Sequence, residues 1–261
     1  MTKNNGTQKG PPLLVTMTKE PFQPIRLYYR IPSRTAVISK LRDLECMVEE
    51  PRERCWQWLY HGEAKSVRFA MGGYEDVPAE RQPIVLGRIR FPKHGGMTLQ
   101  TNSTDRAVQA AKFFASRLGP RVVASRYRVV NRFFTADQGT PAQLMNYLDR
   151  EVTVVDPRDA EAAMKEDFKG VSSMADFERV AAQSMERMLK EGKDVPLVED
   201  YPLAPEEETP DFHHLAMGLA FRFERAYEHW RGNTHLTLTA IIMRKVQEHM
   251  GSRAVSRGSW M

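Results

Sequence analysis

Apolar and polar residues alternate along the first half of the chain, and this alternation predicts β-strands. In residues 25–31 the apolar side chains point to one side, while Arg26, Tyr28 and Arg30 share the other. A second run, 54–60, places Trp58 and two further aromatic residues on a common face. The predicted strands span residues 25–31, 54–60, 66–71, 84–91, 97–101 and 121–134.

Two helices interrupt these strands. Ser33 is the expected cap of a helix over about 34–45, and Asn102-Ser103-Thr104 cap a second helix that Gly119 ends. Two strand–helix–strand units predict an α+β domain. We expect an antiparallel or mixed sheet with two covering helices, ferredoxin-like or related, followed by a mainly α-helical region.

The second half of the chain is helical in pattern. Helices are predicted over 141–150, 157–169, 173–191, 210–231 and 235–249. Between the third and the fourth, residues 192–210 hold four prolines and three consecutive glutamates, which predicts an acidic linker or strap outside the core. The expected organisation is a disordered lead-in (1–20), a basic α+β domain (21–139), a helical region (140–191), the linker (192–210), a helical pair (211–250) and a tail (251–261).

Charge is divided unevenly between the two halves. The first 139 residues carry 23 Lys and Arg against 12 Asp and Glu, whereas the remaining 122 carry 15 against 21. A strongly positive face attracts polyanions, so this division indicates a partner class. The sequence holds no apolar run of the roughly 18 residues that a membrane span needs, and we expect no membrane partner. Only two cysteines occur, which favours a reducing cytoplasm.

The basic residues of the first half recur at alternate strand positions. If helices cover the opposite side of the sheet, the open side presents guanidinium groups and aromatic rings together. Arginine pairs with phosphate, and aromatic rings stack on bases, which predicts binding of RNA or single-stranded DNA through its phosphate backbone and unstacked bases. The candidate nucleic-acid-binding residues are Arg26, Tyr28, Arg30, Trp58, Arg68, Arg88, Arg90, Arg126, Arg128 and Arg132.

Other interpretations of the same pattern stay open. The basic face could dock an acidic protein, a second copy or the chain's own acidic half, or it could be an ordinary solvated face. The face that holds Trp58 could equally be core, because tryptophan is mostly buried.

Signals for catalysis are sparse. The sequence contains no recognisable cofactor fingerprint, metal-ligand set or activated nucleophile, so we expect a binding protein with no cofactor and no metal. One enzymatic alternative is a metal-independent ribonuclease using His94, which lies in a glycine-flanked basic loop.

Overall fold

The computed structural model describes residues 12–156, 158, 162, 165–191, 194–203 and 212–257. Its strands are β1 (Ile25–Arg30), β2 (Met47–Glu50), β3 (Cys55–Leu59), β4 (Val85–Arg90), β5 (Met97–Thr101), β6 (Val123–Val130), β7 (Val152–Val154) and β8 (Val198–Pro202). Its α-helices are α1 (Arg34–Arg42), α2 (Thr104–Leu118), α3 (Pro141–Met145), α5 (Met174–Glu191), α6 (Phe212–Trp230) and α7 (Leu238–Arg257). Short 3₁₀ helices include η1 (Gly62–Ser66) and η5 (Asn146–Asp149).

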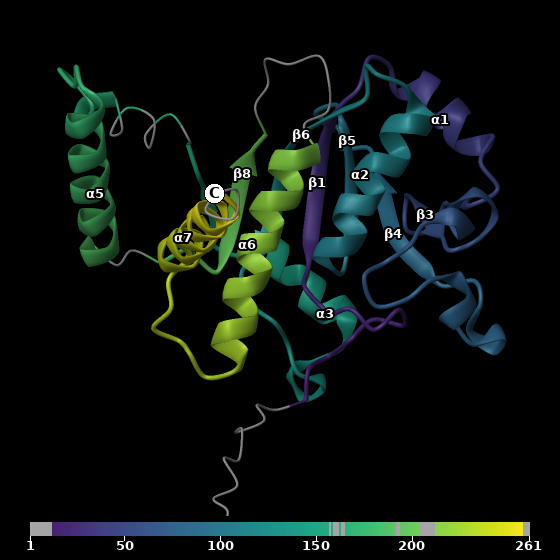
Figure 1. Cartoon of the computed structure of the whole chain (residues 1–261). Coiled ribbons are helices and arrows are strands. Elements are labelled where there is room, and N and C mark those ends of the chain that lie inside the picture. The colour runs from purple at the N-terminus through teal and green to yellow at the C-terminus, as the bar shows by residue number, and fades with distance from the viewer. Residues whose placement is uncertain are drawn as a thin grey trace, which may run out of the picture.

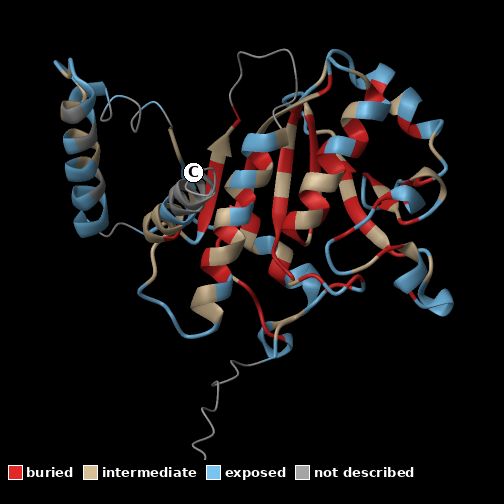
Figure 2. Ribbon diagram, in the orientation of Figure 1, coloured by how far each residue is buried: buried red, intermediate tan, exposed pale blue. Residues whose placement is uncertain are grey.

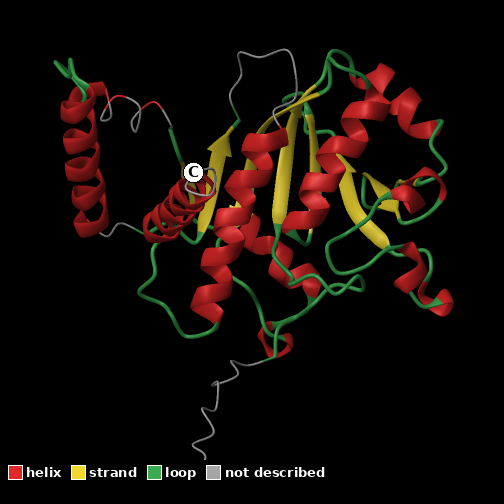
Figure 3. Cartoon of the chain, viewed as in Figure 1, coloured by secondary structure: helices red, strands yellow, loops and turns green. Residues whose placement is uncertain are grey.

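The expected α+β class is confirmed, but the sheet is larger than the sequence indicated. In the part of the chain that the structure describes, eight strands form one mixed sheet in the order β2-β3-β4-β5-β1-β6-β8-β7. Only the β7–β8 pair is parallel, and the other neighbouring pairs are antiparallel. Figure 3 shows the strands as one twisted layer behind the helices.

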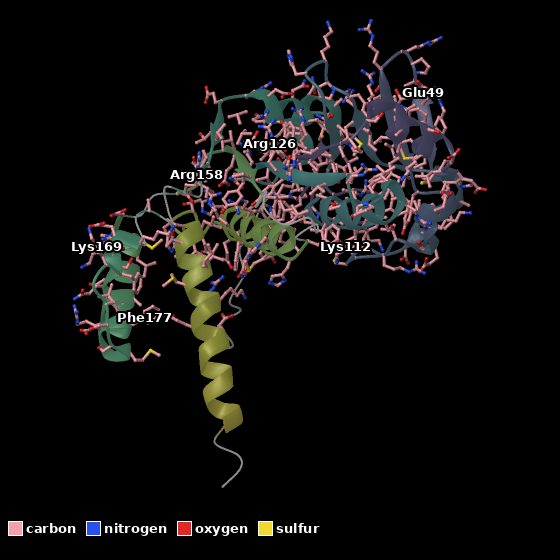
Figure 4. The ribbon with its side chains drawn as sticks, turned by 90° about the horizontal axis from the view of Figure 1, so that it is seen from above. Glu49, Lys112, Arg126, Arg158, Lys169 and Phe177 are labelled. Carbon is pink, nitrogen blue, oxygen red and sulfur yellow. The ribbon has the colours of Figure 1, made fainter. Side chains whose placement is uncertain are left out.

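The helices α1, α2 and α6 cover one side of this sheet (Figure 1). The predicted caps are present, because the side chain of Ser33 accepts a hydrogen bond from the backbone of Ala36, and that of Ser103 accepts one from Arg106. The helix α5 stands apart from the sheet, and its Phe177 lies well away from the main body (Figures 1 and 4).

The main core lies between the sheet and these helices (Figure 2). Ile25, Leu27 and Tyr29 of β1 point into it, which leaves Arg26 and Tyr28 on the other side. A smaller second core lies on that other side, where α3 and η5 cover one end of the sheet. It consists of Phe22, Val130, Phe134, Leu144, Leu148 and Val198. The main core therefore covers most of one side of the sheet, whereas the other side is covered only at one end.

The two expected strand–helix–strand units do not form a matched pair. Helix α2 connects β5 to β6. In the sheet, β1 lies between these two strands and is antiparallel to both. In contrast, β3, β4 and β5 separate β1 from β2, so β1–α1–β2 does not repeat this arrangement.

Several predicted elements are corrected by the structure. The strand expected over 66–71 is the end of η1 and a loop that contains only an isolated bridge between Phe69 and Gly72. The segment 192–210, expected to be an acidic strap outside the core, contains β8, which pairs with both β6 and β7 inside the sheet. The last helix runs to Arg257, beyond its predicted end. Six of the thirteen residues of the helix predicted over 157–169 lie outside the described residues, as do all of 1–11 and 204–211.

Residues 12–20, expected to be part of a disordered lead-in, pack on the body of the protein. Glu20 forms a buried ion pair with Arg106 of α2, with 3.2 Å between Oε1 and Nε. The remaining donors of Arg106 reach Thr18 Oγ1 at 2.7 Å, Asn102 Oδ1 at 3.0 Å and the Val85 carbonyl at 3.2 Å. A buried guanidinium with its donors satisfied is stable, and it fastens this segment to α2.

A second buried ion pair joins α6 to the sheet. Arg222 Nη2 lies 2.6 Å from Glu199 Oε1, and the guanidinium lies near the rings of Tyr127 and Tyr201, at 5.1–5.5 Å from their centres. This explains why the acidic segment enters the core, since its buried carboxylate is paired. No helix in the described part of the chain is both long and apolar enough to cross a bilayer.

Candidate nucleic-acid interface

Two rows of side chains cross the partly covered side of the sheet, which we call the open face. Residues opposite each other in neighbouring strands share a face, so the strand register decides which side chains meet. The first row is Gln57, Arg88, Gln100, Arg26, Arg128 and Asp200. The second row is Arg90, Thr98, Tyr28, Arg126 and Pro202. The structure therefore brings together six of the residues predicted from the sequence.

Two carboxylates from the acidic half neutralise one end of the first row. Asp149 of η5 accepts two hydrogen bonds from Arg26, at 2.7 and 2.9 Å, and Asp200 of β8 accepts two from Arg128, at 2.7 and 3.0 Å. The hydrogen bonds from Arg26 hold the pKa of Asp149 below its usual range. The side chains of Arg26 and Arg128 are only about 15% exposed, so these two cations are committed to protein partners.

Tyr28 stands at the centre of the second row. The guanidinium carbon of Arg126 lies 3.9 Å from the centre of its ring, and Arg126 also approaches Asp200 at 3.5 Å. Arg128 lies 5.4 Å from the same ring. These contacts place two guanidinium groups of β6 against the ring, which favours one orientation of it.

A large pocket of about 1210 Å³ lies over β4, β5 and β1, between the sheet and α3–η5. That volume exceeds the roughly 300–1,000 Å³ of most small-molecule sites. Its walls carry five basic side chains against two acidic ones, Glu53 and Asp149. The basic ones are Arg26, Arg54, Arg88, Arg90 and Lys93. The charge of the pocket is therefore suited to an anion.

The free positive charge of the pocket is concentrated near β4. Arg90 Nη1 donates to Gln100 Oε1 at 2.7 Å, a neutral partner, and within the described ranges no ion pair involves Arg54, Arg90 or Lys93. Arg88 Nε lies 3.6 Å from Glu53 Oε2, which makes a loose ion pair but no hydrogen bond. An enclosed donor without a hydrogen bond is costly, and a closer anionic oxygen would satisfy it.

Trp58 is not part of the open face, which corrects the prediction. It is fully buried on the helix side, and its ring lies 5.4 and 5.3 Å from those of Phe113 and Phe114. Cys55 and Gln57 occupy the opposite side of β3. The indole buries far more apolar area than these residues would, so it takes the core position.

Three of the predicted arginines belong to neither row of the open face. Arg68 is in the loop after η1 and pairs with Glu75. Arg132 follows the end of β6, where it packs over the ring of Phe134 and donates to Gln138. Arg30 is at the exposed end of β1. None of them lines the pocket.

The catalytic alternative gains no geometric support. His94 is exposed in the loop between β4 and β5, does not line the pocket, and has no carboxylate or second histidine bonded to it among the described residues. Both cysteines are buried, and burial raises the pKa of the Cys46 thiol to about 12, so it stays protonated. No group of three His, Cys, Asp or Glu side chains in the described ranges could hold a metal ion.

Sequence reasoning missed several residues that shape the site. The polar residues Thr98 and Gln100 alternate with buried Met97 and Leu99, so their strand pattern could have placed them on the open face. Arg54 and Lys93 were not among the predicted residues. The structure places Arg54 in the turn before β3, although the sequence predicted a strand from residue 54, and Lys93 in the turn after β4. Asp149 and Asp200 come from a half of the chain in which the sequence predicted only helices and a linker.

Comparisons with models of protein families, with curated proteins and with solved structures found no match. The function must therefore be argued from the open face and its pocket.

Proposed function

We propose that the protein binds single-stranded nucleic acid, RNA or DNA, in the pocket over β4, β5 and β1. The observation that carries this proposal is the set of four cations beside β4 that no carboxylate fully neutralises: Arg54, Arg88, Arg90 and Lys93. Guanidinium groups bind phosphate oxygens in bidentate geometry, and Tyr28 in the same pocket offers a ring to a base. The expected roles of Arg26 and Arg128 change, because Asp149 and Asp200 hold them in place.

Duplex binding is a poorer fit to the same geometry. Duplex recognition places a helix or a strand ribbon in a groove, whereas these cations line a pocket in the sheet. A splayed single strand can lower one nucleotide into a pocket and leave its neighbours outside. We propose the cytoplasm as the compartment, because Cys46 and Cys55 are free thiols.

The test is fluorescence anisotropy of a labelled 12-nucleotide single strand with the full chain at increasing salt. Four phosphate contacts predict a slope of log affinity against log salt of about −3 for a single strand. The double variant R88E/R90E should weaken binding at least about 100-fold, since it removes two charged contacts of about 1.5–3 kcal/mol each.

The matched control reverses two exposed cations of α2, which lies on the other side of the sheet. The variant K112E/R117E changes the net charge by the same amount and should weaken binding only slightly. Lys112 and Arg126 are labelled on opposite sides of the sheet in Figure 4. Binding that does not respond to salt, or equal losses in the two double variants, would refute the proposal.

Docking of an acidic protein segment is the second candidate function. It is favoured by one observation, that the basic face already accepts carboxylates from Asp149 and Asp200. The absorbance ratio at 260 and 280 nm separates the two candidates. A nucleic-acid-binding protein purified at low salt carries excess 260 nm absorbance and loses it in a high-salt wash, whereas a protein-docking subunit carries none.

A further inference from the structure

The open face is hollow along β5. This strand lies between β4 and β1, and its side chains on this face are Thr98 and Gln100. Thr98 stands between Arg90 and Tyr28, and Gln100 stands between Arg88 and Arg26. The residues of β5 are shorter than their neighbours on either side, so the sheet forms a trough with longer side chains as its walls. All six residues line the pocket.

One wall of the trough is the ring of Tyr28. Its β6 side is covered by Arg126, which does not line the pocket, whereas Tyr28 and Thr98 both do. The side of the ring toward β5 therefore borders the trough. A cation on one side of an aromatic ring holds the ring in place without covering its other side, so Tyr28 is already oriented for stacking.

The opposite wall is the guanidinium of Arg90, which Gln100 holds through the 2.7 Å hydrogen bond. Neighbouring strands lie about 4.8 Å apart, so the backbones that carry Arg90 and Tyr28 are separated by roughly 9–10 Å. One flat ring between two flat groups needs about 7 Å at contact distances of about 3.5 Å, whereas two stacked rings need about 10.5 Å. Because Gln100 lies on β5, its hydrogen bond draws the Arg90 guanidinium toward the floor of the trough, so the trough has room for one ring at most.

The ends of the trough differ in charge. Arg54 precedes β3 beside the end of β4, and Lys93 follows β4, so both lie beyond Arg90. Asn102, Asn146 and Asp149 line the pocket elsewhere and offer amide and carboxylate groups. A phosphate would lie at the two cations, and the polar edge of a base would lie near the amide and carboxylate groups.

Building on the proposed function, we propose that the trough takes one unstacked base of a single strand between Tyr28 and Arg90, with the adjoining phosphate on Arg54 and Lys93. The rest of the strand contributes phosphates to the rim. Affinity then depends on the presence of a base, and not on charge alone.

The experiment compares two 12-unit probes with the same phosphates, oligodeoxycytidylate and an abasic deoxyribose phosphate chain. Tyr28→Ala should weaken binding of the base-containing probe about 5- to 150-fold, the range given by a stacking energy of about 1–3 kcal/mol. It should leave binding of the abasic probe unchanged, which also shows that the variant is folded. Tyr28→Phe keeps the ring and should bind both probes as the wild type does.

Equal effects of Tyr28→Ala on both probes, or no effect on either, would overturn the inference and leave the proposed function standing. Failure of the wild type to bind either probe would refute the proposed function, and this inference with it. Cytidine monophosphate tests the source of the base. If the site binds a nucleic-acid single strand, the free nucleotide should compete only near millimolar concentrations, because its one phosphate replaces the several phosphates of the oligonucleotide. Competition at micromolar concentrations would overturn the assignment to a strand.

Discussion

The guanidinium carbon of Arg126 lies 3.9 Å from the centre of the Tyr28 ring, and this contact divides the open face into two parts. Toward β6 and β8, the cations are paired with Asp149 and Asp200. Toward β4, the cations line the pocket and Glu53 is the one acid paired with them in the described part of the chain. A surface that looks uniformly basic in the sequence thus consists of one part whose cations are paired with acids and one part whose cations are mostly unpaired among the described residues.

Asp149 limits the positive charge of the pocket, so its removal should strengthen anion binding. The side chain is 60% exposed, and a unit charge in water contributes about 1 kcal/mol at 4 Å. Asp149→Asn should raise the affinity for the 12-nucleotide single strand about two- to fivefold at low salt, measured by anisotropy.

Glu49→Gln is the matched control for Asp149→Asn. Glu49 is an exposed acid of β2, paired with Arg42 on the helix side of the sheet, and its loss changes the net charge equally. It should leave the affinity unchanged. A weaker affinity in Asp149→Asn would mean instead that the ion pair with Arg26 is needed to form the pocket.

Gly218 of α6 is required by the position of Tyr127. A Cβ at residue 218 would lie 2.7 Å from the Tyr127 hydroxyl, which is buried and has no hydrogen-bond partner among the described residues. Gly218→Ala should lower the free energy of unfolding by about 1–3 kcal/mol, although alanine favours helices by about 1 kcal/mol. Tyr127→Phe removes the obstructing oxygen, and in that background Gly218→Ala should be neutral or stabilising. Urea unfolding of the wild type, the two single variants and the double variant measures the coupling between the two substitutions. Additive effects on the free energy of unfolding would contradict the packing argument.

Glu20→Gln should destabilise the protein in a pH-dependent way. Burial by itself raises the pKa of Glu20, but the charge of Arg106 and the hydroxyls of Thr16 and Thr18 outweigh it, and the pKa is lowered. A lowered pKa means that the carboxylate stabilises the fold above the ordinary pKa near 4.5, and that this contribution is lost as the pH falls through the lowered value. At pH 7 the variant leaves Arg106 buried without its counter-charge, which costs about 3–5 kcal/mol.

The measurement is the difference in unfolding free energy between wild type and Glu20→Gln, from urea titrations at several pH values. It should be largest at pH 7 and shrink below about pH 4.5. Glu75→Gln removes an exposed partner of Arg68 and should leave the free energy of unfolding nearly unchanged, because water screens exposed ion pairs. A difference that stays constant down to low pH would contradict the assigned ion pair.

The alternation of residues in β1, β4 and β6 was enough to predict that Arg26, Arg88, Arg90, Arg126 and Arg128 share a face, because side chains in a strand alternate. It failed for Arg132, which lies beyond the end of β6. It could not decide between the two faces of β3, since Cys55 and Leu59 are also apolar. In β3 the large indole ring takes the buried side, and Trp58 is part of the core.

The sequence could not predict β8, because prolines and acidic residues are typical of exposed segments. Glu199 and Asp200 are buried only because Arg222 and Arg128, distant in the sequence, supply their counter-charges. The sequence could not predict the pocket either, since the pocket depends on α3 and η5 packing against the open face through Leu144 and Leu148.

The pairing of β6 with β8 has a consequence for synthesis on the ribosome. The strand β6 is complete at residue 130, but its neighbour ends at residue 202. Until then the growing polypeptide carries an open β-edge that other chains could join. A fragment that stops at residue 139 would keep that edge permanently, so the later half of the protein also guards the earlier half against aggregation.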